Sequence, residues 1–234
     1  MTTLRIGHKG AHHIAPGNTL ASFDAALAHA VDMIEFDILP EDPERPSEGR
    51  LVLAHDYSDG IADALDLDTG LAHLASLPFA GIRLDVDLKL PGYEDRVVEA
   101  LRAHGLVDRA LVSTMYMRSL VRLRTLEPAL RLGWSVPRIR RDYAASPLLA
   151  LPAHAGLVYL RRKVVSAARR HLAARRCDAL MVNWRLVSRG LVRAVREEGG
   201  ELYVWTVDDA RRIRALEALG VTGVITNDPR LFTA

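Results

Sequence analysis

Acidic side chains of the kind that bind metal ions stand in two short aliphatic runs of this sequence. Glu35 and Asp37 belong to MIEFDI, and Asp87 belongs to LDVDLKL. Residues two apart in an extended strand point to the same side, so Glu35 and Asp37 are expected to share one face. Three carboxylates that lie close together repel one another unless a cation sits among them. Oxygen ligands suit a hard ion, Mg²⁺ or Ca²⁺, better than Zn²⁺. We therefore predict one divalent-cation site, whereas an acidic pair alone could equally form salt bridges with arginine.

A loop rich in histidine follows the first aliphatic run, LRIGH. The stretch HKGAHH places His8 and Lys9 directly after this run, and a second run, LVLAH, ends at His55. Titratable and cationic side chains are costly to order on one loop unless something anionic or metallic binds there. The sequence thus predicts that this loop belongs to the same site as the carboxylates.

Nine aliphatic runs must position these side chains, and they alternate with amphipathic segments rich in arginine and alanine. This alternation is typical of βα units and a parallel sheet. LVLAH (51–55) follows the polar segment PEDPERPSEGR and is assigned as a side strand. The remaining runs are assigned as eight barrel strands, at residues 4–8, 33–38, 84–90, 110–114, 132–136, 179–183, 202–207 and 223–226. We therefore predict an α/β fold, one TIM (β/α)8 barrel domain over residues 1–234, with its chemistry at the carboxyl ends of the strands.

Two helices are predicted in more detail. The first covers residues 19–30, with Asn18 or Thr19 as its N-cap, and has an apolar stripe formed by Leu20, Phe23, Leu27 and Val31. The second lies within the basic segment 160–176 and has an apolar face formed by Leu160, Val164, Val165, Ala168 and Leu172. We interpret the second as a solvated helix that packs through this face. The alternative is a contact with anions or with a lipid surface.

The composition limits the partners and the compartment. The chain has 234 residues, 49% of them hydrophobic, which is enough for one large core. A net charge of +2 gives no argument for nucleic acid, and the single cysteine excludes an intrachain disulfide. No secretory signal and no apolar run of membrane-spanning length is seen. We expect a cytoplasmic protein with at most peripheral membrane contact and no obligate protein partner.

Six motifs carry a resemblance to a known family. In chain order they are HKGAHHIAPGNT, IEFD, LAHD, VDLK, VWTVDD and GVTGVITNDP. This ordered set, from residue 4 to residue 229, resembles the glycerophosphodiester phosphodiesterases, which are metal-dependent barrels among the phospholipase C-like phosphodiesterases. The resemblance implies hydrolysis of a small-molecule glycerophosphodiester to sn-glycerol 3-phosphate and an alcohol.

The resemblance also implies a role for each candidate residue. His8 and His55 act as general acid and base, and the metal ligands are Glu35, Asp37 and Asp87. Lys89 faces the phosphate, and Trp205 lies against the alcohol part of the substrate. The chemistry agrees, because an anionic phosphodiester requires neutralised phosphoryl oxygens, an activated nucleophile and a protonated leaving group. A cation with Lys9 and Lys89 suits the first need, and two histidines suit the others.

The sequence departs from the family pattern in four places. Lys9 replaces an arginine, Gly17 replaces the glutamate of PENT, and Asp87 replaces a glutamate. Residues 56–86 lack the LDRTTNG type of sequence, so the insertion after the second barrel strand is expected to be short and the lid over the site reduced. These features leave two alternatives open. One is a lysophospholipase D or sphingomyelinase D-like enzyme that cleaves phospholipids. The other is a barrel without turnover that binds phosphodiesters or a protein partner.

Overall fold

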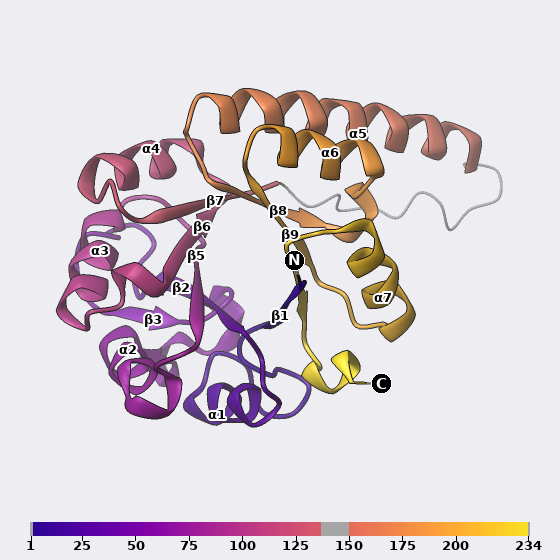
Figure 1. Cartoon of the computed structure of the whole chain (residues 1–234). Helices are drawn as coiled ribbons and strands as arrows, with labels where there is room; N and C mark the ends of the chain where they lie inside the picture. The colour runs from indigo at the N-terminus through magenta and orange to yellow at the C-terminus, as the bar shows by residue number, and fades with distance from the viewer. Residues whose placement is uncertain (1, 137–149, 234) are drawn as a thin grey trace.

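Eight parallel strands form a closed barrel in the computed structural model, within residues 2–136 and 150–233, the part of the chain that the structure describes (Figure 1). They are β1 (Leu4–Gly7), β2 (Met33–Pro40), β5 (Arg83–Leu88), β6 (Ala110–Thr114), β7 (Arg131–Ser135), β8 (Ala179–Asn183), β9 (Glu201–Trp205) and β10 (Gly223–Thr226). Neighbours in this order pair in parallel, and β1 pairs with both β2 and β10, which closes the ring. All eight predicted barrel strands are therefore confirmed.

Helices cover the outside of the barrel (Figure 1). They are α1 (Leu20–Ala28), α2 (Leu67–Ala75), α3 (Glu94–Ala103), α4 (Met117–Leu126), α5 (Ala150–Ala173), α6 (Arg189–Glu197) and α7 (Ala210–Leu219). The main core lies between these helices and the strands, and on β2 it takes the outward side chains of Ile34, Phe36 and Ile38. None of the helices in the described ranges is long and apolar enough to cross a bilayer.

The inside of the barrel changes from apolar to polar along the strands. A cluster of inward side chains fills one end, formed by Ile6, Met33, Leu111, Ala179, Met181, Tyr203 and Ile225. Further along the same strands the inward positions of β2 and β5 carry Glu35, Asp37, Asp85 and Asp87, since inward side chains recur every second residue. The polar end is the carboxyl end of the strands, which we call the mouth of the barrel.

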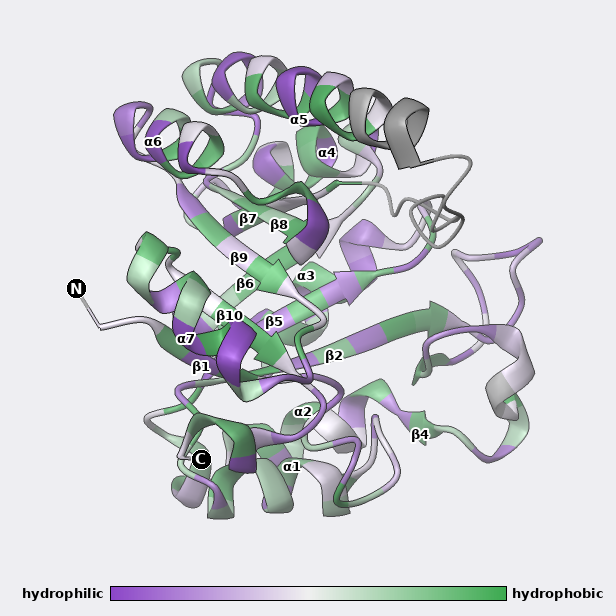
Figure 2. Cartoon of the chain, turned by 90° about the vertical axis from the view of Figure 1, so that its right-hand side faces the viewer, coloured by the Kyte–Doolittle hydropathy of each residue, from purple (hydrophilic) through white to green (hydrophobic). Residues whose placement is uncertain are grey.

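The predicted side strand is confirmed, and it lengthens its neighbour. β3 (Leu51–Leu53) runs antiparallel to the end of β2 and pairs with the two-residue strand β4 (Leu65–Asp66). β2 consequently continues to Pro40, two residues past the predicted end, because Leu39 and Pro40 pair with β3. Glu35 and Asp37 thus lie within β2 rather than at its end. Figure 2 shows this excursion beyond the barrel on the side toward which the strands point.

Helix α1 is shorter than predicted at its carboxyl end. Thr19 is its N-cap, as one of the two predicted alternatives, and its hydroxyl accepts a hydrogen bond from the amide of Ser22 at 3.2 Å. The Ser22 hydroxyl caps Thr19 in return, so the start is a capping box. The helix ends at Ala28, before the predicted residue 30, because Ala30 adopts a left-handed φ of 52°.

Helix α5 is much longer than the basic segment predicted from the sequence, since it begins at Ala150. Its apolar face buries Val164, Ala168 and Leu172, as predicted. Leu160, which was expected on the same face, is 39% exposed. The neighbouring residues Leu157 and Arg161 face the protein, since Leu157 packs against the core and Arg161 donates to the carbonyl of Arg185, so Leu160 lies to one side of the packed stripe.

Candidate active site

The three carboxylates predicted as metal ligands come together at the mouth. The parallel register places Asp37 opposite Asp87 and Glu35 opposite Asp85 on β2 and β5. One carboxylate oxygen from each of Glu35, Asp37 and Asp87 lies within 4.8 Å of the other two. Glu35 and Asp37 are buried, whereas Asp87 is partly open. Three converging hard oxygen donors fit a divalent ion such as Mg²⁺ or Ca²⁺.

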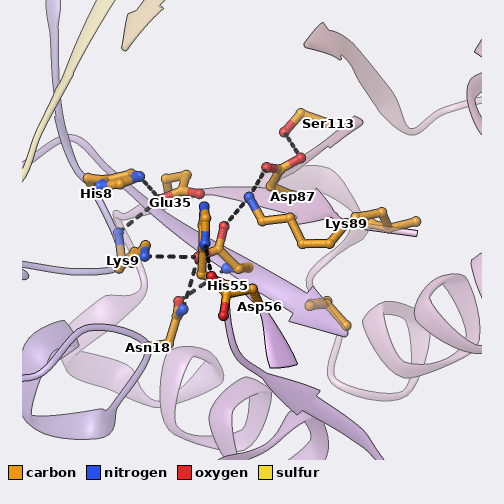
Figure 3. A network of polar contacts seen from close by, with 12 residues as sticks. His8, Lys9, Asn18, Glu35, His55, Asp56, Asp87, Lys89 and Ser113 are labelled. Carbon is orange, nitrogen blue, oxygen red and sulfur yellow. Dashed lines mark hydrogen bonds and ion pairs between the residues drawn. The ribbon is translucent and has the colours of Figure 1, made fainter. Parts of the chain in front are cut away.

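Lys89 provides the positive charge nearest to this cluster. Its Nζ lies 2.5 Å from Asp37 Oδ1 and 2.5 Å from Asp87 Oδ2 (Figure 3). Burial alone lowers the pKa of Lys89. The negative charges of Asp87 and Asp37 outweigh this effect, so the pKa lies well above its usual value. Burial likewise raises the pKa of Asp37, yet Lys89 overcomes this and holds it well below its usual range. Glu35 has no such partner, and burial together with the Asp37 charge raises its pKa.

The loop after β1 wraps around the carboxylates. The amide of Lys9 donates to Glu35 Oε2 at 2.8 Å, and Lys9 Nζ lies 3.9 Å from Asp37 Oδ2. Asn18 binds Asp37 twice, because its side-chain NH2 donates to Oδ2 at 2.9 Å while its carbonyl accepts from the Asp37 amide at 3.1 Å. Lys9 and Asn18 both have left-handed φ values, 52° and 60°. The loop therefore turns back sharply, and it holds Lys9 against Glu35 and Asp37 within β2.

Gly17 is packed too closely for a side chain. A Cβ at this position would lie 2.8 Å from the Cβ of Lys9 and 2.8 Å from Nδ1 of His12. The Gly17 amide donates to this His12 nitrogen at 3.2 Å. The glutamate expected here from the family pattern would thus displace the stem of Lys9, so the two departures, Lys9 and Gly17, belong to one local arrangement.

His8 is held by residues that follow the last two strands, β9 and β10. Its Nδ1 lies 2.6 Å from Asn227 Oδ1, while the Asn227 side-chain NH2 donates to Asp208 Oδ2 at 2.7 Å. An ionised carboxylate only accepts, so Asn227 must turn its carbonyl to His8, and the proton of the neutral imidazole lies on Nδ1. Nε2 of His8 then presents a lone pair, 3.8 Å from Glu35 Oε2. Burial lowers the pKa of His8 to about 4.

His55 reaches the site from the β3 excursion rather than from a barrel strand. Its Nδ1 lies 3.3 Å from Asp56 Oδ2, and both residues are drawn with the network in Figure 3. The side chain of His55 is 44% exposed, compared with 19% for His8. The two histidines therefore differ in environment, one enclosed by the barrel and one open to solvent.

Trp205 is the last residue of β9, opposite Asn183 on β8. Its side chain is half-buried and packs against the inner apolar cluster that includes Tyr203, two residues earlier on the same face. The predicted substrate-binding tryptophan therefore lies at the same end of the barrel as the carboxylates.

Several residues of the network were not predicted from the sequence. They are Asn18, Asp85, Ser113, Asp208 and Asn227. Asn18, Asp208 and Asn227 stand inside the motifs that carry the family resemblance, so a signal was present. Asp85 shares the inward face of Asp87 by simple alternation; the Ser113 hydroxyl donates to it at 2.7 Å. Burial, with the neighbouring charge of Asp87, raises the pKa of Asp85 to about 8.

The whole barrel matches a known protein family. The model of the glycerophosphoryl diester phosphodiesterase family matches residues 8–84 and 86–231. A glycerophosphodiester phosphodiesterase of Caldanaerobacter subterraneus is 24% identical over 265 residues, covering 98% of this chain and 96% of that protein. A second, of Bacillus subtilis, is 23% identical and is covered over 85% of its length.

Solved structures share the fold. A glycerophosphodiester phosphodiesterase of Agrobacterium tumefaciens superimposes with a TM-score of 0.69 at 21% identity, over 99% of this chain and 100% of that one. A phosphodiesterase of Oleispira antarctica, determined in complex with the product sn-glycerol-3-phosphate, has a TM-score of 0.71 at 20% identity and covers 99% of this chain and 96% of its own.

Proposed function

This chain belongs to the glycerophosphoryl diester phosphodiesterase family, and from that premise we propose that it hydrolyses glycerophosphodiesters to sn-glycerol 3-phosphate and an alcohol. One divalent cation, Mg²⁺ or Ca²⁺, is proposed as its cofactor. The observation that carries the proposal is the convergence of Glu35, Asp37 and Asp87 within 4.8 Å at the mouth of the barrel. When bound there, the cation withdraws charge from the phosphoryl oxygens.

Lys9 and Lys89 are proposed to bind the phosphate. Both ammonium groups lie at the edge of the carboxylate cluster, 3.9 Å and 2.5 Å from the nearest oxygens of Asp37. An anionic diester in the mouth therefore has two positive charges beside the proposed cation site. Charges placed where negative charge develops in the transition state stabilise it more than they do in bulk water.

His8 is proposed as the general base. Its pKa of about 4 keeps it neutral at neutral pH. Because Nδ1 is bonded to Asn227, the lone pair is on Nε2, on the side of the ring toward Glu35. A neutral imidazole with its other nitrogen already donating is suited to accept the proton of a nucleophilic oxygen. Asp208 and Asn227 position this ring without touching the substrate.

His55 is proposed as the general acid for the leaving alcohol. Its side chain is open to solvent and comes from a different segment than His8, so the two rings can act on different oxygens of the phosphodiester. The leaving alkoxide needs a proton, and Asp56, with Oδ2 3.3 Å from Nδ1 of His55, orients the ring. Trp205 is proposed to contact the alcohol part of the substrate from the half-buried end of β9.

The lysophospholipase D or sphingomyelinase D-like alternative receives no support from the relatives, whose names describe glycerophosphodiester phosphodiesterases. A barrel without turnover is also less well supported, because each proposed group is present and the carboxylates converge.

The experiment compares glycerophosphocholine, glycerophosphoethanolamine, lysophosphatidylcholine and sphingomyelin as substrates, with sn-glycerol 3-phosphate measured as the product. We expect release from the first two, loss of turnover in excess EDTA, and recovery with Mg²⁺ or Ca²⁺. Glu35→Gln, which keeps the size of the side chain, should stay folded and lose turnover and cation binding by calorimetry. Full activity in EDTA would refute the three-carboxylate site, and cleavage of the lipids alone would refute the substrate class.

A further inference from the structure

Large apolar side chains are exposed mainly at one end of this protein. Within the described residues, eight large apolar side chains are exposed over more than a third of their surface, namely Ile14, Tyr57, Leu77, Met115, Val121, Val158, Tyr159 and Leu160. Ile14, Tyr57 and Met115 lie on segments that leave the carboxyl ends of β1, β3 and β6. Three more lie in the first half of α5. Leu77 and Val121 stand elsewhere, so six of the eight surround the mouth.

The first half of α5 belongs to the mouth for a topological reason. A helix that follows a barrel strand returns antiparallel to it, so it begins at the carboxyl end of the strands. Figure 2 shows α5 with its N-terminal half toward the side where the strands point. Among residues 156–173 of this helix, whose exposure the structure describes, the buried positions are Val164, Ala168 and Leu172. Val158, Tyr159 and Leu160 precede them and are exposed, although Leu157 on the same turn packs against the core.

The segment that contains Val158, Tyr159 and Leu160 is strongly basic. Residues 150–176 contain seven arginine or lysine residues and no aspartate or glutamate. Arg169 is neutralised by Glu197 and Glu198 of α6. Arg162 and Lys163, by contrast, have no acidic partner within the described part of the chain, and Lys163 lies 5.4 Å from the centre of the Tyr159 ring. Two unpaired cations therefore adjoin three exposed apolar side chains.

We propose that this apolar and basic rim, formed by Ile14, Tyr57, Met115, Val158–Leu160, Arg162 and Lys163, docks the mouth of the barrel on an anionic lipid surface. Apolar side chains that enter the headgroup region, next to lysine and arginine that pair with lipid phosphates, are the two features by which peripheral helices bind membranes. Tyr159 has the amphipathic ring that suits this interface.

The arrangement favours a lipid surface over a protein groove partner. The apolar residues come from four separate segments around one opening, which matches a broad, flat partner. The charged side chains beside Val158–Leu160 are all positive, which matches a surface of the opposite sign, whereas Asp42 and Asp56 lie near Tyr57. Docking in this orientation brings substrates released at the lipid surface to the carboxylates, but it does not depend on turnover.

Vesicle cosedimentation of the full chain tests the proposal. The probe is vesicles of phosphatidylcholine and phosphatidylglycerol at a ratio of about 7:3, with pure phosphatidylcholine as reference, at about 0.1 M salt. We expect preference for the anionic vesicles, weakened by added salt. Arg162→Gln with Lys163→Gln should lower the partition coefficient about tenfold or more. Tyr159→Ser with Leu160→Ser should lower it to a similar extent, even though charge is unchanged.

The matched control removes the same charge from the other end of the segment. Arg175 and Arg176 are exposed beyond the C-terminal end of α5, so Arg175→Gln with Arg176→Gln should change partitioning less than threefold. All variants should hydrolyse soluble glycerophosphocholine at rates within about twofold of the wild type, which separates docking from the proposed activity. The proposal would be overturned if the control and rim variants lost vesicle binding equally. It would also be overturned if the wild type bound anionic vesicles no more strongly than pure phosphatidylcholine vesicles. A concentration-dependent dimer abolished by the Tyr159 and Leu160 substitutions would overturn it as well.

Discussion

His8 donates a hydrogen bond of 2.6 Å from its Nδ1 to the side-chain carbonyl of Asn227. The carboxylate of Asp208 fixes the orientation of this amide through bonds of 2.7 Å to its NH2 group and 2.8 Å to its backbone N–H. The tautomer of His8 is thereby decided by two residues that need not contact the substrate, and the nitrogen left free is the one that faces the carboxylates.

The first prediction concerns the pH dependence of this base. Burial lowers the pKa of His8 to about 4. As the pH rises, kcat/KM should therefore increase around pH 4 and then stay constant up to neutral pH. A bound cation would lower this pKa further, so the direction is unchanged. Asn227→Asp places a carboxylate beside Nδ1, which favours the charged ring and should move the acid limb to higher pH. A pH profile measured at constant ionic strength checks this, and an unmoved limb in the folded variant would contradict the role of His8 as base.

The second prediction separates the two histidines by the leaving group. His55→Ala should slow hydrolysis of glycerophosphocholine far more than that of a nitrophenyl phosphodiester, whose leaving group hardly needs a proton. His8→Ala should slow both substrates to a similar extent, since each requires an activated nucleophile. General acid and base contributions are on the order of a hundredfold or more. Steady-state kinetics on folded variants decide it; wild-type rates for both variants on both substrates would rule out the two-histidine mechanism.

The third prediction concerns Lys89, which contacts two of the proposed metal ligands. Lys89→Met should lower kcat/KM on the order of a hundredfold by removing a charge near the phosphate. It should also tighten binding of Mg²⁺ in calorimetry, because no ammonium then competes for Asp37 and Asp87. Lys9→Arg, which retains the charge, serves as the comparison and should keep substantial activity. Unchanged cation affinity in Lys89→Met would show that the ammonium and the ion do not share these oxygens.

The fourth prediction concerns Asp85 and stability. Its pKa of about 8 in the folded protein lies above that of an unfolded aspartate. Between about pH 4 and pH 8, Asp85 is therefore protonated in the folded state and ionised in the unfolded state. This contribution to stability is complete below about pH 4 and is lost as the pH rises to about 8. Asp85→Asn cannot ionise, so in EDTA it should be more stable than the wild type near pH 8 by a few kcal/mol, on the order implied by a shift of several pKa units. Urea unfolding at pH 5 and pH 8 measures this, and equal differences at the two pH values would contradict it.

Local alternation made the carboxylate site predictable. Glu35 and Asp37 share a face because side chains alternate along a strand, and the sequence places Asp87 at the same level of the next parallel strand. The order of aliphatic runs was sufficient for the barrel, since βα units close in only a few ways.

Contacts between distant segments were harder to predict. Asn227 lies 219 residues from His8 in the sequence, and only ring closure between β1 and β10 brings them together. The pairing of Lys89 with two carboxylates depends on the register of β2 and β5, which no single segment encodes. The exposure of Leu160 likewise depends on the line along which α5 contacts the rest of the protein, which runs through Leu157 and Arg161.

The pairing of β1 with β10 also has a consequence for synthesis. Asn227 is made 219 residues after His8, and their strands become neighbours only when the barrel closes. A nascent chain that still lacks β10 therefore carries a histidine whose tautomer is not fixed and whose burial is incomplete. The proposed hydrolysis should therefore begin only after β10 has been made and has joined β1, so that activity reports closure of the barrel.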